Sequence, residues 1–500
     1  MSRLVVLPAA LMVLLAGCDT GRQAQLYHAE KALWRIAKRQ EAISALPPEI
    51  RHERQLELAE AHRGLAAELP APDPTRTAKP DDPTLTRLYR LRAAAQLEGA
   101  RWLIAAGRDS TALEMIERTC REYTWNPRVT AEAYRNRFLL LERMGDPRAY
   151  AQAVEEMLAA VDLSAPGVEP PAPLLQSLRR SARLFQVHGD PDRAGIQRQA
   201  AREELKRLLA RGLTGSPRIL AHTELALLAL EGNNTGEALE HYQAALDMSR
   251  GTQWEPSLRF ALANFHLGDP GQPEEAVEGF KQLARRHPES PLSARGLLMA
   301  GATLRSMGAY EEARRVLAWA DSLAARDREL HASIVFEQGL VEEDRGDWSS
   351  ALSLYRQAAV DAPRSRAALN APLQIAQHHL RDGDRQAAES VLRRSIRDYD
   401  RLIEQEEESQ VVLLAMEMRS QARILLEDWP AAVEGLLELA RRAPRSEFAP
   451  LALAEAARLS EQKLERPEQT RQIWRRLLER YPGTPLAAIA ARELEAETRP

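Results

Sequence analysis

Small and large apolar residues recur along the chain at offsets that suit one face of an α-helix. Ala351, Tyr355 and Ala358 lie at positions i, i+4 and i+7, which form one stripe of a helix. Gly346 lies five residues before Ala351, where it can end a preceding helix, and Pro363 lies twelve residues after, where it blocks continuation. The pattern therefore predicts a unit of two antiparallel helices.

This unit recurs at regular intervals. The residues that correspond to Ala351 fall at positions 194, 238, 276, 313, 351, 388, 432 and 470, so the intervals are 44, 38, 37, 38, 37, 44 and 38 residues. We interpret segments 211–218 and 402–410 as insertions that lengthen the two intervals of 44. Gly301 and Gly339 each lie seven residues before the next turn glycine, as small residues at a close contact between paired helices would. The repeat predicts an all-α array of stacked helix pairs.

The pattern also divides the chain. Asp146-Pro147 is expected to disturb a weaker unit around Gly145. We expect a signal peptide at 1–17, an N-terminal helical pair at 18–67, a Pro-rich linker at 68–84, degenerate repeats at 85–163, a second Pro-rich linker at 164–173 and the main solenoid at 174–500.

The amino-acid composition agrees with an all-α protein, and the net charge argues against nucleic acid as a partner. Aromatic residues make up only 5% of the chain, while the strong helix formers Ala, Leu, Arg and Glu recur throughout. The net charge is −4 with both signs interspersed, so nucleic acid is not expected as a partner.

The N-terminus predicts a lipid anchor. Residues 4–15 form an apolar run that is too short to span a bilayer, so we interpret it as part of a signal peptide. The following Leu15-Ala16-Gly17-Cys18 resembles the lipobox of bacterial lipoproteins, which implies a diacylglycerol and acyl modification on Cys18. A plain secretory signal is the alternative. The other cysteine, Cys120, is predicted to be a buried structural thiol.

The repeat resembles the tetratricopeptide repeat, although its period of 37–44 residues exceeds the usual 34 or so. A HEAT-like array fits the period but not the Gly, aromatic and Pro positions. The resemblance implies a right-handed α-solenoid whose groove is lined by the first helix of each pair. The groove-facing positions would be Arg295, Leu298, Ala302 and Arg305 in one unit, Ser333, Phe336, Leu340 and Glu343 in the next, and Asn370, Leu373, Gln377 and Leu380 in the third. Each apolar member could equally belong to the core.

Catalytic chemistry is not indicated. The sequence contains no HExxH, Walker loop, GxGxxG or GxSxG motif, and the adjacent His378 and His379 would point to different sides of a helix. We therefore expect no metal, no cofactor, no catalytic residue and no small-molecule substrate.

The lipobox together with the repeat array resembles envelope lipoproteins of Gram-negative bacteria. These include BamD-like outer-membrane assembly factors, pilus-assembly pilotins and polysaccharide-export lipoproteins. Residues 478–495, with Tyr-Pro-Gly between helices, are similar to the BamD-like repeat. The resemblance implies a periplasm-facing scaffold that holds partner proteins in an envelope assembly complex. Glycan or peptidoglycan-fragment binding, or an enzyme with a diffuse active site, are the alternatives. The outer membrane is the expected location, although Asp19 resembles an inner-membrane retention signal.

Overall fold

The described parts of the chain are mostly helical. The computed structural model describes residues 20–40, 43, 46–73, 79–161, 172–268, 271–324, 327–405 and 410–496. Within these ranges there are 23 α-helices and no strand, which confirms the all-α prediction. None of the described helices is both long and apolar enough to cross a membrane. The predictions for Cys18 and Asp19 lie outside the described residues.

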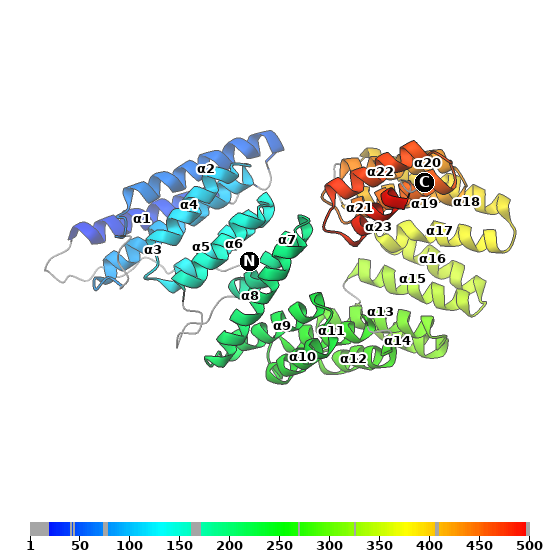
Figure 1. Cartoon of the computed structure of the whole chain (residues 1–500), viewed down its shortest axis with the longest axis horizontal. Helices are drawn as coiled ribbons and strands as arrows, with labels where there is room; N and C mark the ends of the chain where they lie inside the picture. The colour runs from blue at the N-terminus through cyan, green and yellow to red at the C-terminus, as the bar shows by residue number, and fades with distance from the viewer. Residues whose placement is uncertain are drawn as a thin grey trace. The chain divides into compact units, whose positions relative to one another are not determined.

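The helices fall into two compact units that divide between Ser181 and Ala182 (Figure 1). In the first unit each of the helices α2 to α5 packs on the next one along the chain, and α1 packs on α2 and α3. Its helices are α1 (Thr20–Gln40), α2 (Pro48–Glu68), α3 (Pro83–Ala105), α4 (Asp109–Glu122), α5 (Pro127–Met144) and α6 (Pro147–Ala160), and α7 (Ala172–Val187) crosses the boundary.

The expectation that Asp146-Pro147 disturbs this unit is wrong. Pro147 is the first residue of α6, where a proline loses no hydrogen bond because the first amides of a helix have no partner. The Asp146 side chain caps the helix by accepting bonds of 3.0 Å from the amides of Arg148 and Ala149. The dipeptide therefore starts a helix.

The second unit is a stack of helix pairs. Its helices are α8 (Pro191–Ala210), α9 (Gly215–Glu231), α10 (Thr235–Ser249), α11 (Glu255–Gly268), α12 (Pro273–Arg286), α13 (Pro291–Ser306), α14 (Tyr310–Ala324), α15 (Arg328–Asp344), α16 (Trp348–Asp361), α17 (Arg366–Arg381), α18 (Arg385–Gln405), α19 (Gln410–Leu425), α20 (Trp429–Arg442), α21 (Phe448–Gln462), α22 (Pro467–Arg480) and α23 (Pro485–Ala496). The even-numbered helices of this unit are the second helices of their pairs, and the odd-numbered ones from α9 onward are the first helices.

First helices of successive pairs also pack on one another. Such contacts run from α11 through α13, α15 and α17 to α19, whereas second helices make no comparable contacts with each other in the described ranges. Helices on the inner side of a curved stack approach most closely, so the first helices line that side.

The repeated stripe forms the core of the stack. Ala351, Tyr355 and Ala358 on α16 are completely buried, as predicted. The corresponding residues of the other second helices are also buried, including Ala276, Phe280 and Leu283, Ala313, Leu317 and Ala320, Ala432, Leu436 and Leu439, and Thr470, Trp474 and Leu477.

The turn glycines adopt the left-handed conformation that the pattern predicts. Gly308 and Gly346 have φ of 75° and 85° between the two helices of their pairs. Three non-glycine residues take the same place in their repeats, five before the reference position. They are Asn233, Glu427 and Glu465, with φ of 59°, 59° and 51°. The backbone of the turn is therefore the same with or without glycine.

The helical glycines mark close contacts, as predicted. A Cβ atom on Gly339 would lie 2.6 Å from Cε1 of Tyr355, and one on Gly301 would clash with the Leu317 side chain. In both pairs the first helix approaches the large residue of the stripe so closely that only glycine fits.

The two long intervals arise mainly in second helices. α8 has 20 residues and α18 has 21, whereas α12, α16, α20 and α22 each have 14. Segment 211–218 adds little loop, since α9 already begins at Gly215. The extra residues of this repeat therefore lengthen helix α8, and segment 211–218 is not an inserted loop.

Cys120 is a buried structural thiol, as predicted. Cys120 is only 4% exposed, and burial raises the pKa of its thiol to about 12. It therefore stays protonated and packs as a small apolar side chain.

Candidate partner-binding surface

The predicted groove residues lie on three successive first helices, α13, α15 and α17, but the apolar ones serve mainly as core. Phe336 is 9% exposed and Leu373 is 4% exposed. Leu298, Leu340 and Leu380 are half-buried and pack against core clusters. The Phe336 ring lies 5.2 Å from that of Tyr355 on the paired helix. Phe336 and Leu373 therefore do not contribute to an open surface.

The polar members remain accessible to different degrees. Arg295 on α13 and Gln377 on α17 are exposed, while Ser333 and Asn370 are half-buried. The Ser333 hydroxyl donates 2.8 Å to the carbonyl of Glu329 within its own helix. The open part of the surface is thus polar.

Arg305 connects α13 to α15. Its Nε lies 2.7 Å from Oε1 of Glu337, and its Nη1 lies 2.9 Å from Oδ2 of Asp344. The two carboxylates are seven residues apart, or two helical turns. Burial alone would lower the pKa of the Arg305 guanidinium, but hydrogen bonds from it to both carboxylates raise that pKa above its usual value. The cation is therefore held between two points of the next first helix.

Glu343 connects α15 to α17 in a similar manner, with one neutral and one cationic partner on α17. Its carboxylate, with a side chain only 4% exposed, accepts a bond of 3.0 Å from Nε2 of Gln374 and pairs with Arg381. These two partners are also seven residues apart. Tyr355 Oη donates to the same carboxylate over 2.5 Å. We call the contacts of Arg305 and Glu343 the inter-repeat ladder.

The environment keeps Glu343 ionised. Burial by itself would raise the pKa of the carboxyl, but bonds from Tyr355 and Gln374 and the charge of Arg381 outweigh it and lower that pKa below its usual value. Burial and, to a smaller extent, the bond to Glu343 raise the pKa of Tyr355 far above its usual value, so the phenol remains the donor.

A stacked pair of aromatic rings lies beside Glu343, at the α15–α17 part of the inter-repeat ladder. The rings of Trp348 on α16 and His378 on α17 lie 3.4 Å apart and nearly parallel, at 7°. His378 Nδ1 lies 3.2 Å from Glu343, whereas His379 contacts the Trp348 ring edge-on. Both histidine rings thus contact Trp348 and lie 6.2 Å from each other, so they do not point to different sides of the helix as the sequence predicted.

Sequence reasoning found Arg305 and Glu343 but missed their partners. The signal was present in the spacing, since the partners of Arg305 lie 32 and 39 residues later and those of Glu343 lie 31 and 38 residues later. These separations bracket one repeat of 37 to 38 residues. Opposite charges one repeat apart therefore predict contacts between first helices.

Two buried arginines were also missed. Arg419 on α19 bonds Asp400 on α18 over 2.9 Å and Glu438 on α20 over 2.8 Å. Arg137 on α5 pairs in the same way with Glu117 on α4 and Glu156 on α6. Each acid lies 19 or 20 residues from its arginine, so each arginine connects the helix before its own to the helix after it.

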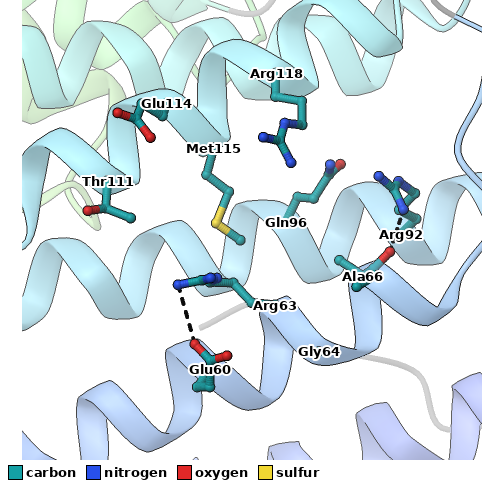
Figure 2. Close-up of a pocket in the computed structure, with 11 residues that line it drawn as sticks. Glu60, Arg63, Gly64, Ala66, Arg92, Gln96, Thr111, Glu114, Met115 and Arg118 are labelled. Atoms are coloured by element: carbon teal, nitrogen blue, oxygen red, sulfur yellow. Dashed lines mark hydrogen bonds and ion pairs between the residues drawn. The ribbon is translucent and has the colours of Figure 1, made fainter.

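The first unit contains a polar cavity of about 450 Å³ between α2, α3 and α4 (Figure 2). Arg92 forms one wall, held by a bond of 2.9 Å to the carbonyl of Leu69. Arg63 and Arg118 extend into the same region from α2 and α4, with Met115 between them. The lining carries charges of both signs, including Glu60.

Comparison with protein families identifies the repeat. Residues 257–290, which cover most of α11 and all of α12, match the tetratricopeptide repeat. This chain contains a tetratricopeptide repeat. The second unit as a whole is a tetratricopeptide-like solenoid, as the sequence predicted.

The solved structures to which this chain is similar have low sequence identity to it. Yeast Tom70 is 12% identical over 94% of this chain and 98% of that chain, with a TM-score of 0.41. A Rap protein complexed with competence and sporulation factor is 15% identical over 74% of this chain and 99% of that chain, with a TM-score of 0.34. YrrB, described as a TPR protein with an unusual peptide-binding site, is 16% identical over 45% of this chain and 98% of that chain, with a TM-score of 0.28. No curated protein matches the chain at a significant level.

Proposed function

We propose that the protein is a non-enzymatic, lipid-anchored scaffold that faces the periplasm and holds partner proteins of an envelope assembly complex. The tetratricopeptide fold favours protein–protein interaction in general. The lipobox-like sequence at Cys18 supports the anchor and the envelope location. The outer membrane remains the proposed site, with the inner membrane as the alternative because of Asp19.

The inter-repeat ladder is the observation that supports this binding surface most directly. It holds α13, α15 and α17 in a set register through charge-assisted bonds, so the polar side chains between them have defined positions. A preformed surface binds an extended or helical segment with less loss of entropy than a mobile one. We therefore place the partner on these first helices.

Site-directed crosslinking in the native envelope tests this placement. A photo-reactive amino acid at Arg295 or Gln377, both exposed on first helices, should capture the same partner protein. The control position is Arg394 on the second helix α18, whose side chain is 82% exposed. If Arg394 captures the same partner and the two first-helix positions capture nothing, the proposed surface is wrong.

The lipid anchor has a separate test. Cys18→Ser removes the acylated sulfur, so after carbonate and high-salt washing the protein should fractionate with the soluble periplasm and keep its helical circular dichroism. Membrane association that resists carbonate and high-salt washing in this variant would contradict the anchor.

Glycan binding is the weaker candidate. Sugar-binding grooves need aromatic rings that face the ligand, and Phe336 was the aromatic residue predicted to do so. Its side chain packs in the core beside Tyr355. The observed surface therefore favours a protein partner.

A further inference from the structure

The first helix of the chain presents an unusual outer face. On α1, Tyr27, Lys31, Trp34 and Lys38 follow one another at intervals of four, three and four residues and so form a single stripe. Tyr27 is 59% exposed and Trp34 is 51% exposed. Among the described residues, these are the only two aromatic side chains that are exposed.

Folding does not require this stripe. The opposite face of α1 supplies Ala29 and Ile36 to a cluster with Leu58, Leu65 and Leu88 of α2 and α3. The core of the unit is therefore complete without the two exposed rings. Large exposed aromatic groups that do not serve the core mark surfaces that meet something else.

The charges of α1 favour an anionic surface. The helix carries five Lys and Arg residues and one carboxylate, Glu30. Arg87 of α3 already neutralises Glu30 over 2.6 Å. Lys31 and Lys38 make no ion pair with any described residue, and their Nζ atoms lie 5.7 Å and 4.4 Å from the centroids of the Tyr27 and Trp34 rings.

We propose that this stripe is a membrane-contact surface that lies flat on the headgroups of anionic phospholipids. Tyrosine and tryptophan prefer the membrane interface because one end of each ring system is apolar and the other hydrogen-bonds water. Lysine can bury its stem there and extend its ammonium group to the phosphates. The stripe spans about 16 Å, at 1.5 Å per helical residue.

The position of α1 suits this role. α1 begins at Thr20, two residues after Cys18, so an acylated Cys18 would lie within about 7 Å of the helix. In this respect the inference builds on the proposed anchor. The stripe would fix the orientation of the first unit on the bilayer, which a flexible acyl attachment alone does not do. Binding by the stripe itself needs no acyl chain.

Vesicle binding by an unacylated chain separates the two ideas. The chain from residue 18 onward with Cys18→Ser keeps every described helix and has no lipid. It should sediment with vesicles of phosphatidylglycerol and phosphatidylcholine at 3:7 but not with phosphatidylcholine alone.

Lys31→Gln with Lys38→Gln should weaken the binding about 30-fold, because each cation near such a surface contributes about 1 kcal/mol. Tyr27→Ser with Trp34→Ser should weaken it at least about tenfold.

The matched control removes two exposed cations elsewhere. Arg393→Gln with Arg394→Gln on α18 changes the net charge by the same amount and should leave vesicle binding unchanged. Circular dichroism of each variant verifies that it is folded. Equal loss in the control, or no preference of the parent chain for anionic vesicles, would overturn the proposal. Either result leaves the Cys18 anchor, which is tested in cells, unaffected.

Discussion

At the residue scale, Glu343 shows how one buried carboxylate organises a repeat boundary. It accepts bonds from Tyr355 and Gln374 and pairs with Arg381, so three helices meet at one side chain. A buried charge is tolerated only when its bonds are satisfied. Its position could be predicted as surface-facing from the repeat, but its burial could not, because burial depends on residues one repeat later.

The lowered pKa of Glu343 makes a prediction about stability and pH. Because its pKa in the folded chain lies below the usual value of about 4.5, the carboxylate stabilises the fold above that pH, and this contribution is lost as the pH falls further. Glu343→Gln should lower the free energy of unfolding at pH 7 by about 2 kcal/mol, the range for bonds to a charged group. Urea unfolding at pH 7 and pH 3.5 should show a smaller difference from the parent at the lower pH.

The control for this prediction is Glu461→Gln on α21, an exposed glutamate. Surface changes of this kind alter stability by no more than about 0.5 kcal/mol. A difference between parent and Glu343→Gln that stays constant with pH would contradict the assigned ionisation.

At the scale of the helix pair, the turn backbone is the most regular feature. The turn between the two helices has positive φ at the same repeat position in Gly308, Gly346 and Gly383 and in the non-glycine residues Glu427 and Glu465. An L-residue with a side chain pays about 1 to 2 kcal/mol in this conformation. The packing of the pair, and not the local residue, therefore imposes the turn.

Replacing a strained turn residue should stabilise its pair. We expect Glu465→Gly, at φ of 51°, to raise the free energy of unfolding by about 1 kcal/mol and to slow amide exchange at the end of α21. The control Glu455→Gly lies inside α21 and should lower stability by about 1 kcal/mol, the usual cost of a helical glycine. A destabilising Glu465→Gly would show that its side chain, and not its backbone, matters at the turn.

At the scale of the whole chain, we expect a destabilising change in one helix pair to affect mainly the pairs next to it. Each pair of the second unit contacts mainly its neighbours, so the array resembles a one-dimensional stack. The ladder and the clamps of Arg419 add bonds across successive pairs. A disturbance should therefore spread to adjacent pairs and weaken with distance along the chain.

Gly339→Ala tests this expectation. The new methyl group would overlap the Tyr355 ring, and overpacking of this kind costs about 1 to 3 kcal/mol. Hydrogen exchange should become faster in α15 and α16 and less so in α14 and α17, with α2 to α4 of the first unit unchanged. Gly195→Ala on α8 is the control, because a Cβ there meets only Arg198 at 4.0 Å and should be neutral or stabilising. A uniform change in exchange would contradict local stability.

The sequence alone determined the helix pairs, because the small–large–small stripe, the turn glycine and the closing proline act within one repeat. It also indicated the close contacts of Gly301 and Gly339, which recur at a set offset. Tertiary structure decided which first-helix residues are open. Each first helix packs against the second helix of its own pair and also against helices of the neighbouring pairs. This packing buries Phe336 and Leu373 and leaves Arg295 and Gln377 exposed. The partners of Arg305 and Glu343 were likewise decided by the stacking of repeats, since residues 31 to 39 apart meet only when successive pairs pack in one register.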